Sequence, residues 1–104
     1  MLQATTPTFI LTPKDKQGQA IDLSEAQNVY FSLKQGPFSL KKTGSALEIS
    51  GSTVSVYLTQ AETVPIREGQ CEIQLNWTYP NGARAGTVKK IVAVSDNLLK
   101  EVVE

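Results

Sequence analysis

The residues that could do chemistry in this chain are few and scattered. Among its 104 residues are no His, one Cys and ten Asp or Glu. Without His, the chain lacks the usual side chain for general acid–base catalysis, for zinc binding and for pH switching. Asp15, Asp22 and Glu25 lie close in sequence, but they lack the alternating spacing and turn Gly of a calcium loop. The sequence therefore predicts no metal and no other cofactor.

Nucleophilic catalysis is also poorly supported. A reactive Ser or Cys would need a neighbouring base, and only carboxylates or Lys remain to provide one. The sequence contains no Gly-rich phosphate loop, nucleophile elbow or dinucleotide fingerprint. A chain of this size leaves little room for the substrate cleft that paired carboxylates need in glycoside hydrolysis. We therefore predict that the protein is not an enzyme.

Some side chains are better candidates for contact with a partner. Tyr30 and Tyr57 alternate with aliphatic residues, so they are expected on the outer faces of their strands. Lys89, Lys90 and Arg84 fall in a segment whose alternation is interrupted, as at an exposed sheet edge. We take these five residues as the candidate interaction surface. Alternatively, Tyr30, Tyr57 and Trp77 could form an aromatic platform for sugar, although the alternation places Trp77 in the core.

The overall charge argues against two large classes of partner. Ten Lys and Arg balance ten Asp and Glu, giving a formal net charge of zero. Such a chain has no long-range attraction for nucleic acid or anionic lipid. No apolar run approaches the ~20 residues that span a bilayer, and the N-terminus does not resemble a secretion signal. We expect neither nucleic acid nor a membrane as partner.

The remaining sequence reads mainly as short strands. Residues 8–12 form a first strand that Pro13 ends, and a polar turn follows at 14–19. Alternating residues then predict four further strands and place Phe31 among the core residues. These strands are expected at residues 29–35, 38–42, 47–50 and 54–58.

The clearest pattern covers residues 70–94. Cys71 and Trp77 belong to an unbroken apolar alternation over residues 71–79, which predicts a long strand with both residues facing the core. Residues 79–82 (Tyr-Pro-Asn-Gly) predict a chain reversal. On the return arm, Gly86 and the Lys pair blur the alternation, which indicates a bulge or an exposed edge.

Helical content should be limited to one or two turns. Residues 24–27 could form one turn capped by Asp22 or Ser24. Residues 59–62 have the spacing of a capping box, with Thr59 as N-cap and Glu62 reaching back to it. Residues 98–103 fit either a last strand or a helical turn.

About seven short strands joined by Gly, Pro and Asn turns predict an all-β fold, an antiparallel β-sandwich. We expect a single domain over residues 1–104, with its core in residues 8–103. A lone Cys71 cannot form an internal disulfide, so the fold must rest on packing. The Cys…Trp…Cys pattern of antibody domains is absent, so any immunoglobulin-like character is one of architecture.

The chain resembles small proteins of Firmicutes tailed phages and prophages in four segments, residues 29–36, 56–63, 71–85 and 97–103. Those proteins are usually encoded among virion structural genes. The strand pattern is also similar to the immunoglobulin-like N-terminal domain of siphophage upper baseplate proteins. This chain ends where their connecting and receptor-binding regions would begin, which argues against direct host attachment.

The resemblance implies a non-enzymatic structural or assembly module of the tail, baseplate or head, acting by protein–protein contact. Its partners would be other virion proteins or copies of itself, in a homo-oligomer or a larger assembly. The protein would be made in the bacterial host cytoplasm and located in the virion. Two alternatives remain open: a phage-encoded inhibitor of a host defence protein, and a carbohydrate-binding module.

Overall fold

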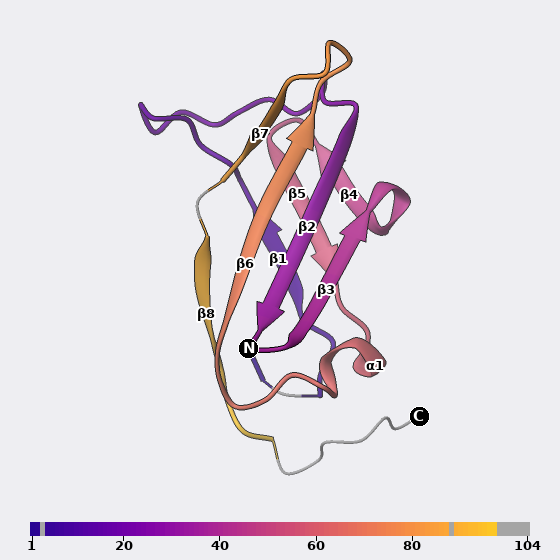
Figure 1. The fold of residues 1–104 in the computed structure, drawn as a ribbon, viewed down its shortest axis with the longest axis vertical. Coiled ribbons are helices and arrows are strands. Elements are labelled where there is room, and N and C mark those ends of the chain that lie inside the picture. The colour runs from indigo at the N-terminus through magenta and orange to yellow at the C-terminus, as the bar shows by residue number, and fades with distance from the viewer. Residues whose placement is uncertain (3, 88, 98–104) are drawn as a thin grey trace.

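The computed structural model describes residues 1–2, 4–87 and 89–97 (Figure 1). Strands dominate, and every strand pairing in the described part is antiparallel, which confirms the predicted all-β antiparallel fold. The strands are β1 (Thr8–Leu11), β2 (Asn28–Gln35), β3 (Phe38–Thr43), β4 (Leu47–Ser50), β5 (Thr53–Tyr57), β6 (Gly69–Thr78), β7 (Arg84–Gly86) and β8 (Lys90–Val94). Two short helical turns are η1 (Gly44–Ala46) and α1 (Gln60–Thr63).

These strands form two sheets. A three-stranded sheet has the order β1-β5-β4, which places β1 at an edge, as Pro13 predicted. A five-stranded sheet has the order β3-β2-β6, with β7 and β8 both pairing along the far side of β6. Figure 1 shows β2, β3 and β6 in front of β1, β4 and β5, so the sheets form two layers. No described helix is long and apolar enough to cross a membrane.

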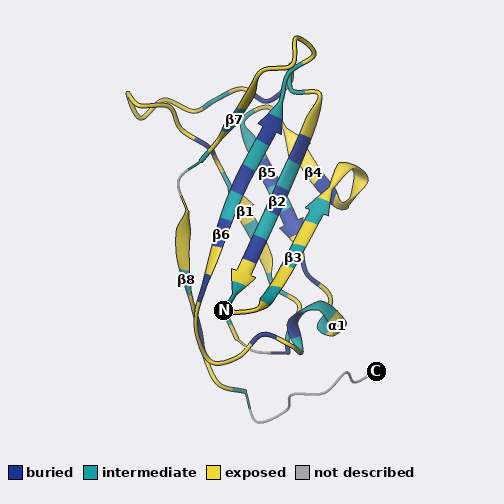
Figure 2. Cartoon of the chain, viewed as in Figure 1, coloured by how far each residue is buried: buried dark blue, intermediate teal, exposed yellow. Residues whose placement is uncertain are grey.

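The hydrophobic core lies between the two sheets. Along β2, Val29, Phe31 and Leu33 are buried while the intervening residues are more exposed, and Figure 2 shows the same banding on β6. The rings of Phe9 on β1 and Phe31 on β2 stack with centroids 5.8 Å apart, joining one sheet to the other. Burial of alternate strand residues from both sheets is the main driving force for this arrangement.

The alternation predicted for the long strand is confirmed. Cys71 and Trp77 on β6 are each 1% exposed. Burial raises the pKa of the Cys71 thiol, so this residue acts as a small apolar side chain rather than a ready thiolate. The indole Nε1–H of Trp77 donates to the Tyr79 hydroxyl at 3.0 Å, which satisfies the buried ring's one polar group.

One of the two anticipated helical turns is formed at its predicted place. Thr59 and Glu62 make the reciprocal capping-box bonds at the start of α1. The prediction of a helical turn at residues 24–27 is wrong, because the chain makes a non-helical turn there. Oδ1 of Asp22 accepts the backbone N–H of Ser24 at 2.9 Å, which holds this turn and keeps the pKa of Asp22 below its ordinary value.

The return arm after β6 contains a bulge. Gly82, with φ of 88°, makes the predicted reversal possible. Asn76 of β6 pairs with Gly86, and Ile73 pairs with Lys90. Two residues of β6 but three of the return arm separate these pairs, so the arm carries one extra residue. The blurred alternation is therefore explained by a bulge on an edge.

The bulge changes which side chains face inward. Lys90 lies opposite buried Ile73, on the inner side of the sheet, while the next residue, Ile91, turns outward and is 61% exposed. Val88, expected in the same arm, and the strand or helical turn expected at residues 98–103 lie outside the described residues.

Two local features complete the edges of the fold. Residues 14–19, expected as a polar turn, belong to a small hairpin closed by a bridge between Lys14 and Ala20. At the chain start, the carbonyl of Met1 accepts the backbone N–H of Ser95 at 2.7 Å, and Leu2 bridges the same residue in parallel. The N-terminal residues thus lie alongside the end of β8.

Candidate functional site

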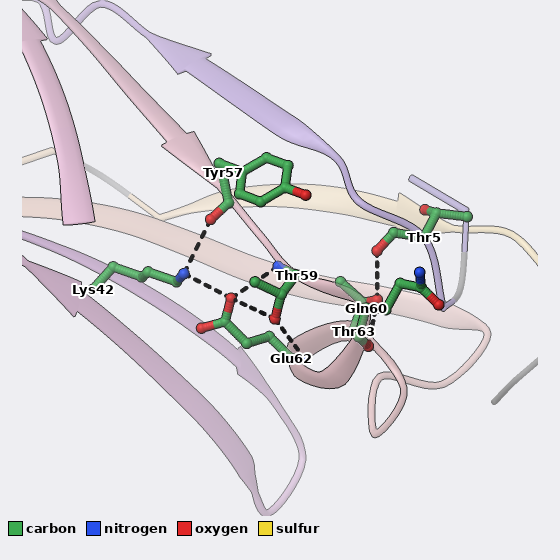
Figure 3. Close-up of polar contacts among 7 residues, drawn as sticks. All are labelled: Thr5, Lys42, Tyr57, Thr59, Gln60, Glu62 and Thr63. Carbon is green, nitrogen blue, oxygen red and sulfur yellow. Dashed lines mark hydrogen bonds and ion pairs between the residues drawn. The ribbon is translucent and has the colours of Figure 1, made fainter. Parts of the chain in front are cut away.

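A cluster of polar contacts lies where β3 approaches α1 (Figure 3). Nζ of Lys42 lies 2.6 Å from Oε1 of Glu62 and donates to the Tyr57 carbonyl at 3.0 Å. The same carboxylate oxygen accepts the backbone N–H of Thr59 at 2.9 Å. Lys42 belongs to the five-stranded sheet, whereas Tyr57 ends β5 of the other sheet. The lysine therefore clamps the two sheets together along one side.

The electrostatics of this clamp suit a structural role. The side chains of Lys42 and Glu62 are 13% and 24% exposed, so solvent screens the pair only in part. Partial burial alone would raise the pKa of Glu62, but the hydrogen bond and charge of Lys42, with hydrogen bonds from Thr59, hold it below its ordinary value. Both charged groups are engaged with each other and with the backbone, as expected of a structural contact.

A hollow lies at the other edge of the two sheets. This groove has a volume of about 830 Å³ and lies between β1 with its following hairpin and the edge formed by β6, β7 and the start of β8. We call it the β1–β8 groove. In Figure 1, β7 and β8 run along one side of β6, and β1 lies behind β6. Its apolar lining comes from both sheets and from the segment after the hairpin: Ile10, Leu11, Ile21, Ile73, Leu75, Trp77 and Ala85.

The rim of the β1–β8 groove is basic. Lys14 and Lys16 come from the hairpin, while Lys89 and Lys90 come from the opposite side. Of the described lining residues, Asp15 alone is acidic, and its Oδ1 already accepts two backbone N–H groups of its own turn, each at 2.9 Å. Four lysines against one engaged aspartate give the rim a positive potential, although the whole chain is neutral.

The groove runs beside a sheet edge that has no partner strand in the described part of the chain. Among the described residues, β1 pairs with β5 alone. The N–H of Leu58 donates to the carbonyl of Pro7 at 3.0 Å, which fixes the direction of bonding at that position. Because this direction alternates along an antiparallel pair, the backbone groups of Thr8 and Ile10 face away from β5. Residues 8–11 also carry no charge, and Ile10 is 69% exposed.

The structure brings together only part of the predicted interaction surface. Lys89 and Lys90 meet at the groove. Arg84 is exposed on β7 and does not line it. Tyr30, half-buried, lies on the outer face of the five-stranded sheet, whereas Tyr57, 52% exposed, lies on the outer face of the three-stranded sheet. The tyrosines therefore do not form one aromatic platform.

Lys89 differs from Lys90 in its surroundings. Nζ of Lys89 lies 3.7 Å from Oε2 of Glu72, and both side chains are about half exposed or more. Such a surface pair contributes little. Lys90, turned inward by the bulge, has its side chain toward the groove, so it is the stronger contributor to the rim.

The sequence prediction missed the clamp lysine and half of the rim. Lys42 occupies the same alternating phase as Phe38 and Leu40, and this inward phase was the available signal. Lys14 and Lys16 were assigned to a turn. No local pattern could place that turn beside β8, because their meeting depends on how the two sheets stack.

Among the described residues, no three His, Cys, Asp or Glu side chains gather as metal ligands would. Comparisons with protein-family models, curated proteins and solved structures found no match for this chain.

Proposed function

We propose that this protein is a non-enzymatic structural or assembly module that acts by contact with other proteins. The observation that carries this proposal is the β1–β8 groove, an apolar hollow with a basic rim beside an unpaired sheet edge. These features are typical of surfaces that bind protein segments, since a free edge supplies backbone hydrogen bonds and a groove accepts side chains. The lysines of the rim would set the charge of the partner.

We further propose that the contacts occur in a phage virion, in its tail, baseplate or head. Support comes from the resemblance of residues 56–63 and 71–85 to phage structural proteins. Two antiparallel sheets with a shared core are compatible with an immunoglobulin-like sandwich, which we propose as the architecture. A net charge of zero also reduces repulsion between closely packed copies.

In this proposal the protein is made in the host cytoplasm and then joins other virion proteins or copies of itself. The test is to purify particles and assembly intermediates from a lysate of the encoding strain and to quantify this chain by mass spectrometry. A constant ratio to the major capsid protein across gradient fractions is expected. Absence from both particles and intermediates would overturn the virion assignment.

The same lysate separates the two other functions considered. Stable association with a host nuclease, without any virion protein, would identify an inhibitor of host defence. Binding to glycans on an array would favour a carbohydrate-binding module, although such a site usually needs clustered exposed aromatic rings.

A further inference from the structure

We propose that the β1–β8 groove binds an extended segment of a partner protein in which apolar and acidic residues alternate. The inference rests on the proposed function and specifies the surface and the chemistry of the partner. The segment would pair with the free edge of β1 as an added antiparallel or parallel strand.

The backbone of β1 supplies the first part of the recognition. Thr8 and Ile10 direct their N–H and C=O groups away from β5, toward the free edge. Other edges are less open to addition. The outer edge strand β3 carries the exposed Lys41, and the end of β8 is lined by the N-terminal residues. On β4, the other edge of the three-stranded sheet, the N–H of Leu47 is already bonded to the carbonyl of Gly44. An added strand is therefore best accommodated at β1.

The apolar lining supplies the second part. Side chains of a strand point alternately to its two sides, so every second residue of an added segment would enter the groove. There it would meet Leu11 and Ile21, with Leu75 and Trp77 behind them. A volume of about 830 Å³ holds several aliphatic side chains. The alternate residues of the partner should therefore be apolar.

The rim supplies the third part. Lys16 and Lys90 approach the groove from opposite sides, with Lys14 and Lys89 beside them. The register after the bulge is what turns Lys90 to the inner side. The partner residues that stay outside the groove would lie at its rim, close to the exposed Lys16 and Lys90. Carboxylates are favoured at those positions and basic side chains are disfavoured.

A protein segment fits these features better than nucleic acid does. An apolar lining and a row of unpaired backbone groups have no counterpart in phosphate recognition, which relies on positive charge and on aromatic stacking. The single Trp77 is 1% exposed and so cannot stack on a base. Charge alone would suit phosphates, so an oligonucleotide serves as a competing probe in the test.

The test uses a synthetic peptide of about eight residues, a typical strand length, in which valine alternates with glutamate. Binding to the full chain is followed by backbone amide NMR shifts and by the fluorescence of Trp77, the chain's one Trp. Saturable binding with shifts centred on residues 8–12 and 89–90 is expected. A valine–lysine peptide should bind at least about tenfold more weakly because the rim is basic.

A matched pair of proline variants tests the edge. Ile10→Pro removes an N–H from the free edge of β1 and should weaken binding about fivefold or more. Ile49→Pro makes the same change to an exposed isoleucine at the other edge of the same sheet, on β4, and should leave binding unchanged. Circular dichroism and thermal unfolding verify that both variants fold.

A matched pair of charge reversals tests the rim. Lys16→Glu with Lys90→Glu should weaken binding about tenfold. Lys41→Glu with Arg67→Glu changes the net charge equally at exposed residues outside the groove and should leave binding unchanged. If the two pairs weaken binding equally, the rim lysines act only through nonspecific charge, and the proposal is overturned.

Other outcomes overturn the inference without touching the proposed function. No binding of the valine–glutamate peptide at millimolar concentration, or preferential binding of oligothymidylate at the same lysines, would exclude an acidic protein segment. Concentration-dependent dimerisation through residues 8–12 would make a second copy the occupant. If the wild-type chain is found in particles and the Ile10→Pro variant is incorporated equally, the virion role stands and the docking site fails. If the peptide binds as expected but particles lack the chain, the docking site stands and the virion role fails.

Discussion

Lys42 and Glu62 join the two sheets through a contact of 2.6 Å between Nζ and Oε1, and the same ammonium group reaches the carbonyl of Tyr57. This clamp closes the side of the fold where β3 lies. The opposite side, where β1 lies, has the β1–β8 groove instead. The two sides of the molecule therefore differ: one is closed by charged side chains, and the other has an open groove.

Replacement of the clamp lysine tests its contribution to stability. Lys42→Met retains most of the aliphatic stem but loses the charge and the hydrogen bonds to Glu62 and Tyr57. We expect the free energy of unfolding to fall by about 1–2 kcal/mol, because the pair is largely shielded from solvent. Lys41→Met, at the exposed neighbouring position, should change it by less than about 0.5 kcal/mol. Urea denaturation measures both, and equal effects would contradict the clamp.

The clamp also predicts a pH dependence. The pKa of Glu62 in the folded protein lies below its ordinary value of 4.5, so its ionised form stabilises the fold above that pH. This contribution is lost as the pH falls through the lower, folded-state pKa. In Lys42→Met the carboxylate loses its nearby charge, so its folded-state pKa should rise and this pH-dependent stabilisation should become smaller. Carboxyl ¹³C NMR titration of both proteins measures this, and identical titration curves would refute it.

The Trp77–Tyr79 hydrogen bond provides a test of the core. Tyr79→Phe removes the hydroxyl that accepts from the indole Nε1–H at 3.0 Å. Because Trp77 is 1% exposed, its N–H would be left buried without that acceptor, at a cost of about 1–3 kcal/mol. Tyr57→Phe removes a hydroxyl from a ring that is 52% exposed and should be nearly neutral. Thermal unfolding of the two variants compares them directly, and a neutral Tyr79→Phe would contradict the assigned bond.

Gly86, the last paired residue before the bulge, lies close to β6. A Cβ at Gly86 would lie 2.5 Å from Oδ1 of Asn76 and 3.1 Å from the carbonyl of Leu75. Gly86→Ala should therefore destabilise the fold by about 1–2 kcal/mol as β7 shifts outward. Asn76→Ala in the same chain removes the nearer contact and should recover part of this loss. A double-mutant cycle by urea denaturation measures the coupling, and strictly additive effects would contradict the contact.

Local patterns predicted the strands well because alternation and turn chemistry are encoded within a few residues. The reversal at Gly82, the capping box at Thr59 and the burial of Trp77 are all of this kind. The turn at residues 24–27 failed because Asp22 bonds the backbone of Ser24 in a non-helical turn, an alternative that the same residues support equally well.

The candidate site was harder to predict, because it is made by tertiary structure. Lys90 was singled out from an interrupted pattern, but its inward direction follows from a register that only the paired strands define. Lys16, on the hairpin, meets the groove opposite Lys90, which lies more than 70 residues later in the sequence. No periodic pattern in the sequence indicates that these two residues lie near each other.

The most direct test of the docking site is amide hydrogen exchange at the free edge of β1. In the presence of the valine–glutamate peptide, the amides of Thr8 and Ile10 should exchange more slowly, because an added strand would occupy their hydrogen bonds. The amide of Ile49, at the free edge of β4, should be unaffected. Unchanged exchange at Thr8 and Ile10 with saturating peptide would contradict strand addition at β1.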